Sequence, residues 1–113
     1  MTPQQSDLVE RLRTLLAIEP TTRDVSMFGG RVFMVNDKIV VSAGKDGDLL
    51  VRVPAGRHDE LLTHPGASQA EMGTGRTMGP GWISVAAAAI DSLDHLSFWV
   101  KVALAHNRSS DGK

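Results

Sequence analysis

Met27-Phe28-Gly29-Gly30-Arg31-Val32-Phe33-Met34-Val35-Asn36-Asp37, residues 27–37, carries the strongest structural signal in this chain. Two adjacent glycines interrupt an apolar run, and glycine inside a strand pattern marks a bulge, a bend or a close approach of another segment. The run ends at Asn36-Asp37, a pair typical of a two-residue hairpin turn. We therefore interpret Met27, Phe28, Gly29 and Gly30 as a structural motif, with Phe28 and Phe33 in the core and Gly29-Gly30 forming a bulge.

The periodicity on both sides of this segment predicts an antiparallel meander enclosed by helices. Strands are expected at about 25–35, 38–44 and 48–53, with a second turn at residues 46–48. The remaining expected elements are a helix over 7–17, a short helix over 55–63, weak strands at 69–72 and 76–78, a strand at 82–85 and a helix over 92–106. The order α-βββ-α-ββ-α predicts an α+β fold, in which helices flank an antiparallel sheet.

The composition is that of one globular domain. The chain has 113 residues, of which 42% are hydrophobic and none is cysteine, so we expect a single domain over 1–113 with frayed ends at 1–6 and 107–113. The sequence shows neither a leader pattern nor a membrane-spanning run, which indicates a cytoplasmic protein. Twelve Lys and Arg residues are interspersed with thirteen Asp and Glu residues, which argues against direct nucleic-acid binding.

Patterns typical of catalysis or metal binding are missing from the sequence. The histidines lack metal-ligand spacing, and His58, with Asp59, Glu60 and His64, is interpreted as a solvated helix edge. Residues 73–76 lack the lysine and hydroxyl ending of a phosphate loop, and no serine lies in a nucleophile elbow. We therefore expect no catalytic residue, no metal and no cofactor.

Arg52, Arg76 and Trp82 are the candidate ligand-binding residues. Arg52 lies within an apolar strand, Arg76 follows the glycine-rich segment, and Trp82 follows the 73–81 loop. Because arginine binds carboxylates and phosphates through two parallel hydrogen bonds, two arginines on one sheet face would form an anion site. The alternative is that Arg52 is simply an outward-facing position in a strand that alternates over 50–53.

The final helix is apolar on two sides. One stripe is expected to cover the sheet, and it contains Leu93, Leu96, Val100, Ala103 and Leu104. Phe98, Val102 and Ala105 lie nearly opposite this stripe. Since such a helix is either buried between layers or used in an interface, these three residues are candidates for self-association or a partner groove. The alternative is that the chain's tail or its first helix covers them.

Taken in order and spacing over residues 7–106, these motifs resemble the N-terminal domain of the TfoX/Sxy family of bacterial competence regulators. The segments that carry the resemblance are Met27-Phe28-Gly29-Gly30 with Phe33-Met34 and Asn36, Leu50-Val51-Arg52-Val53, Pro65-Gly66-Ala67, Gly75-Arg76 with Met78, Gly81-Trp82-Ile83-Ser84-Val85, and Trp99-Val100 with Ala103-Leu104-Ala105. The resemblance implies a helix-flanked antiparallel sheet of the secretion-chaperone-like type.

Two departures limit what the resemblance implies about function. Full-length members associated with competence carry a second, helical domain that this sequence does not reach, so transcription coactivation is not simply transferred. Many relatives carry a basic residue just before the Gly-Trp step, where this chain has Gly79-Pro80-Gly81-Trp82.

We therefore expect a non-enzymatic protein–protein interaction module, linked to transcriptional or competence regulation. It is expected to form a homo-oligomer such as a dimer and to have a protein partner in the transcription machinery. The competing hypothesis is a small-molecule or anion-binding domain that uses the 73–81 loop and the nearby arginines.

Overall fold

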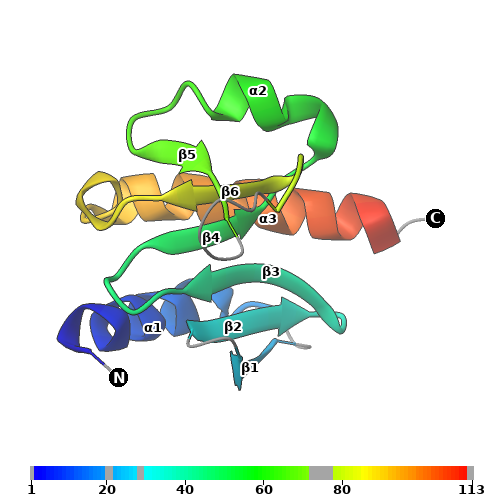
Figure 1. Ribbon diagram of the computed structural model, residues 1–113. Helices are drawn as coiled ribbons and strands as arrows, with labels where there is room; N and C mark the ends of the chain where they lie inside the picture. Colours follow the sequence, from blue (N-terminus) through cyan, green and yellow to red (C-terminus); the bar gives the residue numbers. More distant parts are fainter. Residues whose placement is uncertain (1, 20–21, 28–29, 72–77, 112–113) are drawn as a thin grey trace.

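The computed structural model describes residues 2–19, 22–27, 30–71 and 78–111 (Figure 1). Within these residues, six strands form one antiparallel sheet in the order β1-β2-β3-β4-β6-β5. The strands are β1 Arg23–Met27, β2 Gly30–Val35, β3 Lys38–Ala43, β4 Leu49–Arg52, β5 Ala67–Gln69 and β6 Trp82–Val85. The helices are α1 Pro3–Leu16, α2 His58–Leu61 and α3 Leu93–Asp111, with short 3-10 turns η1 Ala55–Arg57 and η2 Ala87–Ala89. The predicted α+β class and the helix-flanked antiparallel sheet are confirmed.

The predicted strand over 25–35 is in fact two strands. β1 and β2 run antiparallel, and Met27 is the partner of Gly30. Gly30 also lies close to β3, because a Cβ atom there would be 3.0 Å from both the Ala43 carbonyl oxygen and the Ser42 Oγ. A larger residue where β2 begins would therefore require β3 to shift by a few tenths of an ångström. Phe28 and Gly29 lie outside the described residues, so the predicted bulge stays a prediction.

Both predicted turns join the expected strands. Asn36 and Asp37 have φ values of 55° and 64° and connect the paired residues Val35 and Lys38, which is the geometry of a type I′ hairpin. Just before this turn, the pairing of β2 with β3 shifts register between Phe33 and Met34. The second turn is closed by the Gly44 N–H, which donates to the Asp48 carbonyl oxygen at 2.9 Å.

Helix α1 begins at Pro3, earlier than the predicted start at residue 7. Thr2 caps the helix by accepting a hydrogen bond from the Gln5 N–H at 3.2 Å, and proline at the first position needs no N–H partner. The Gln5 Nε2 then donates to the Ala43 carbonyl oxygen at 3.0 Å, which joins the first turn of α1 to the end of β3.

The hydrophobic core lies between one sheet face and helices α1 and α3 (Figure 1). It contains Leu8, Leu12 and Leu16 of α1, the predicted core residue Phe33, Val41, Val51, Ile83 and Val85 of the sheet, and Leu96, Trp99, Val100, Ala103 and Leu104 of α3. Leu93 was predicted to belong to this face but is 58% exposed, because it is the first residue of α3 and the buried positions begin at Leu96.

The end of α3 is fastened to the β2–β3 hairpin. The buried Asn107 donates from Nδ2 to the Val35 carbonyl oxygen at 3.0 Å, and its Oδ1 accepts from the Asn36 Nδ2 at 3.3 Å. These bonds give the helix a partner beyond the predicted end at residue 106, and α3 continues to Asp111.

Short elements complete the fold at the β6 side of the sheet. The predicted helix over 55–63 is present as η1 followed by α2. The weak strand predicted at 69–72 is β5, which lies earlier at Ala67–Gln69, and the one predicted at 76–78 lies mostly outside the described residues. β6 has the predicted bounds of 82–85.

Candidate anion-binding site

A pocket opens where β3 and β4 move apart. Among the described residues the two strands pair only from Val41 to Ala43 and from Leu49 to Val51, whereas Arg52 pairs with Trp82 of β6. In Figure 1 the start of β3 and the end of β4 diverge toward the right, where the C-terminal half of α3 also lies. The pocket has a volume of about 440 Å³ and is lined by Lys38, Ile39, Arg52, Trp82, Ala103, His106 and Asn107.

Arg52 and Trp82, two of the three predicted ligand-binding residues, form one wall of this pocket. They are cross-strand neighbours, and the Arg52 Cζ lies 5.0 Å from the centroid of the Trp82 ring. Such a cation–π contact holds the guanidinium in place while its N–H groups stay available for an oxygen ligand. The predicted alternation of β4 is also confirmed, since Val51 and Val53 are buried and Arg52 is half-buried on the other face.

The backbone of Gly81 lies directly beneath the Arg52 side chain. Gly81 has a φ of 98°, and a Cβ atom there would be 2.6 Å from the Arg52 Nη1. Its carbonyl oxygen accepts a hydrogen bond from the Val53 N–H at 2.8 Å. Any larger residue would strain the backbone and displace the guanidinium, so Gly81 helps to set the position of Arg52.

His58 supports this wall from behind and is not the solvated helix edge that was predicted. Its side chain is buried, and its Nδ1 accepts a hydrogen bond from the Gly81 N–H at 3.0 Å. The proton of the neutral ring is therefore on Nε2, which donates to the Gln69 Oε1 at 2.7 Å. The Gln69 Nε2 in turn donates to the Gly79 carbonyl oxygen at 3.1 Å. The prediction failed because the partners of His58 are distant in sequence.

Basic residues from two other elements face Arg52 across the pocket. Lys38 begins β3, and His106 lies near the end of α3. Burial lowers the pKa of His106 below its ordinary value, and the positive charges of Arg52 and Lys38 lower it further. His106 is therefore mainly neutral at pH 7, next to two side chains that carry a positive charge. Neither residue was predicted to belong to a binding site, because no local motif in the sequence marks them.

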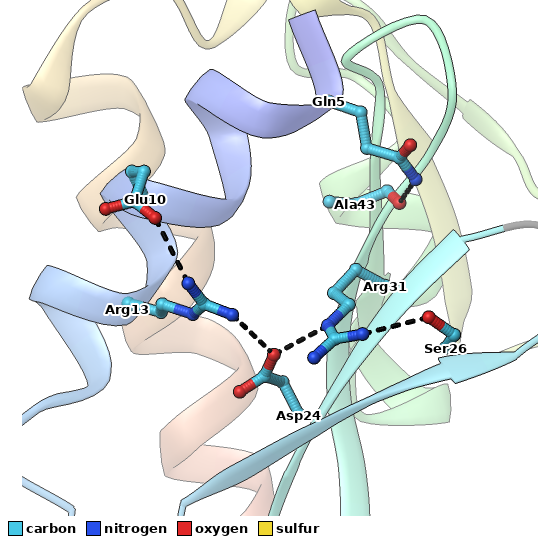
Figure 2. A network of polar contacts seen from close by, with 7 residues as sticks. All are labelled: Gln5, Glu10, Arg13, Asp24, Ser26, Arg31 and Ala43. Atoms are coloured by element: carbon cyan, nitrogen blue, oxygen red, sulfur yellow. Dashed lines mark hydrogen bonds and ion pairs between the residues drawn. The ribbon is translucent and has the colours of Figure 1, made fainter. Parts of the chain in front are cut away.

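Arg52 differs from Arg31 of β2 and Arg13 of α1, which lie near the β1 edge of the sheet. Figure 2 shows Asp24 between Arg31 and Arg13, whose Nε and Nη2 atoms lie 2.6 Å and 3.0 Å from the Asp24 Oδ2. Burial opposes ionisation of Asp24, but the hydrogen bonds and charges of Arg31 and Arg13 outweigh it and hold its pKa below the ordinary value. In the described part of the chain, by contrast, no carboxylate forms an ion pair with Arg52.

The three predicted interface residues do not form one exposed surface. Val102 is only 7% exposed and belongs to the core. Phe98 is half-buried, and its ring stacks on His64 with the centroids 4.8 Å apart. Ala105 is exposed. His64, which follows α2, therefore covers part of the Phe98 ring.

The remaining predicted residues are described only in part. Met27 ends β1 and pairs with Gly30, and the structure does not describe its side chain. Arg76, like Phe28 and Gly29, lies outside the described residues, so its approach to Arg52 stays a prediction.

Two general features bear on the kind of site. Across the described ranges, no group of three histidine, aspartate or glutamate side chains is placed to hold a metal ion. None of the helices in those ranges has the length and apolar character that crossing a bilayer requires.

The sequence matches the TfoX N-terminal domain family over residues 14–107. A comparison with curated proteins finds no match. The matched range contains every residue that lines the pocket and all six described strands. The chain belongs to the TfoX N-terminal domain family.

Proposed function

We propose that this chain is a non-enzymatic binding module whose pocket beside Arg52 binds a small anionic ligand. The observation that carries the proposal is the guanidinium of Arg52, which is held by Trp82 and has no carboxylate partner among the described residues. A half-buried arginine in this position favours an anion from solution as its partner.

The other side chains of the pocket suggest what kind of anion fits. Lys38 adds a second positive charge, whereas Ile39, Trp82 and Ala103 supply apolar surface. A volume of about 440 Å³ lies within the usual range of small-molecule sites. We therefore propose a ligand with one carboxylate, sulfonate or phosphate group and a small apolar body.

Titration with benzenesulfonate, followed by the backbone amide signals in NMR spectra, tests this proposal. Binding should shift the signals of residues 38–39, 52 and 103–107, and Arg52→Met should weaken it about 10- to 100-fold, as expected for the loss of hydrogen bonds to a charged group. Arg57→Met is the matched control, because Arg57 is exposed and lies away from the pocket lining.

Two results would contradict the anion site. One is equal affinity of the Arg52→Met variant and the unchanged protein for benzenesulfonate. The other is equal affinity of the unchanged protein for benzenesulfonamide, which has nearly the same shape but is neutral at pH 7. Either result would show that charge at Arg52 does not determine binding.

We propose as a second function that the domain interacts with protein, including a second copy of itself. Phe98, half-buried on α3, and Ala105, two turns further along the same side and exposed, support this proposal. A dimer of this kind, acting in the cytoplasm with a partner in the transcription machinery, would link the domain to transcriptional or competence regulation. The proposal does not depend on the pocket, because neither residue lines it.

A further inference from the structure

Three basic side chains meet in the pocket from three different elements. Lys38 comes from β3, Arg52 from β4 and His106 from α3, while Trp82 of β6 contributes an uncharged ring. Of the three, only histidine changes its charge near neutral pH. The net charge of the pocket therefore depends on whether His106 carries a proton.

We propose that His106 takes up a proton when the pocket binds its anion, so that affinity for the anion rises as the pH falls. This inference rests on the proposed anion site and assigns to that site a proton-linked regulation.

The empty pocket disfavours a proton on His106 for two reasons. The ring is half-buried, and the positive charges that face it are Arg52 from β4 and Lys38 from β3. Its neighbours on α3 that also line the pocket, Ala103 and Asn107, are uncharged. A third positive charge would therefore be repelled by the first two and would lose part of its hydration.

An anion between Arg52 and His106 reverses this balance. Its negative charge offsets the repulsion from Arg52 and Lys38, and its oxygen atoms accept a hydrogen bond from the protonated ring. The pKa of His106 is therefore higher in the complex than in the empty pocket. By linkage, affinity for the anion increases by up to about tenfold for each unit by which the pH falls between the His106 pKa of the complex and that of the free protein. Outside that interval the affinity is constant.

Benzenesulfonate is a suitable probe because its own charge does not change between about pH 5.5 and 8, where histidine titrates. For the unchanged protein, its dissociation constant should fall by about tenfold as the pH is lowered from about 8 to about 5.5. The measurement uses a cationic buffer, which does not compete for the site. The His106→Gln variant should bind with an affinity that hardly depends on pH. His95→Gln, which alters an exposed histidine on the same helix, should behave like the unchanged protein.

A second measurement needs no variant. The ring proton signals of His106 report its pKa directly in NMR spectra, and this pKa should rise when benzenesulfonate saturates the pocket.

The outcomes separate this inference from the function on which it rests. If benzenesulfonate binds with an affinity that does not change with pH, or if the His106 pKa is unchanged by the ligand, proton uptake is overturned and the anion site remains. A persistent pH dependence in His106→Gln also overturns it. If benzenesulfonate binds at no pH, the anion site itself is wrong, and the inference falls with it.

Discussion

The arginines of this domain show that the partner of a guanidinium decides its role. Arg31 shares the carboxylate of Asp24 with Arg13 and also donates to the Ser26 Oγ at 2.9 Å (Figure 2). The hydrogen bonds of Arg31 therefore join β2 to β1, and Arg13 connects α1 to the same carboxylate. Arg52 is held instead by an aromatic ring, which orients its charge and accepts none of its strong hydrogen bonds. The ion pairs of Arg31 stabilise the fold, whereas the guanidinium of Arg52 remains able to bind an anion in the pocket.

The role of Asp24 can be tested through its dependence on pH. Its pKa in the folded protein is lower than in the unfolded chain, so it stabilises the fold above its ordinary pKa of about 3.9, and this stabilisation is lost as the pH falls through the folded value. Asp24→Asn should therefore reduce the free energy of unfolding by about 1 kcal/mol at pH 7, a modest value because solvent screens the ion pairs.

Urea unfolding followed by circular dichroism at several pH values measures this effect. The difference between Asp24→Asn and the unchanged protein should disappear at the acid end of the series. Asp59→Asn is the control, since Asp59 is exposed on α2 and forms no ion pair with the described residues. Equal stability of the two variants at pH 7 would contradict the role of Asp24.

The helices, strands and turns that could be predicted are those that local residue patterns determine. The Asn36-Asp37 turn follows from two residues that tolerate positive φ, and the alternation of β4 follows from its apolar period. The division between β1 and β2 was not predicted, because the glycines at 29–30 were interpreted as a bulge within one strand and the local pattern does not reveal that Met27 and Gly30 are antiparallel partners. Val102 was placed on the outer side of the last helix, but contacts of α3 with both β3 and β4 widen its buried face.

The length of α3 depends on one buried side chain. Asn107→Ala removes the donor to the Val35 carbonyl oxygen and the acceptor for Asn36, which should lower the free energy of unfolding by about 1 to 3 kcal/mol. The amides of the last turns should also exchange faster with deuterium. Arg108→Ala, which removes the ion pair between the exposed Arg108 and the largely covered Glu19, should change stability by less than about 1 kcal/mol. Equal effects of the two substitutions would show that Asn107 does not anchor the helix.

At the scale of the whole molecule, the pocket is a product of tertiary structure. Arg52 and Trp82 could be selected from sequence, because a charge in an apolar strand and an aromatic after a glycine-rich segment are local signals. Lys38 and His106 could not be selected in this way. They come close to Arg52 only in the folded chain, where β3 and β4 separate and α3 passes behind these two strands. The family relationship predicts the sheet that forms the pocket, but it does not identify which side chains line the pocket.

Self-association is a property of the whole molecule, and Ala105 offers the cleaner test of it. Ala105→Glu places a charge on an exposed position of α3 without removing a core contact, so it should shift a dimer to monomer in sedimentation or light scattering while the thermal midpoint stays nearly unchanged. Phe98→Asp should have the same effect on assembly but should also destabilise the fold, because the Phe98 ring contacts His64 and Trp99 at centroid distances of 4.8 Å and 5.2 Å. If both variants remain folded and have the oligomeric state and protein contacts of the unchanged chain, this side of α3 is no interface. The binding function would then be limited to the pocket, where Arg52→Met acts and Ala105→Glu should not.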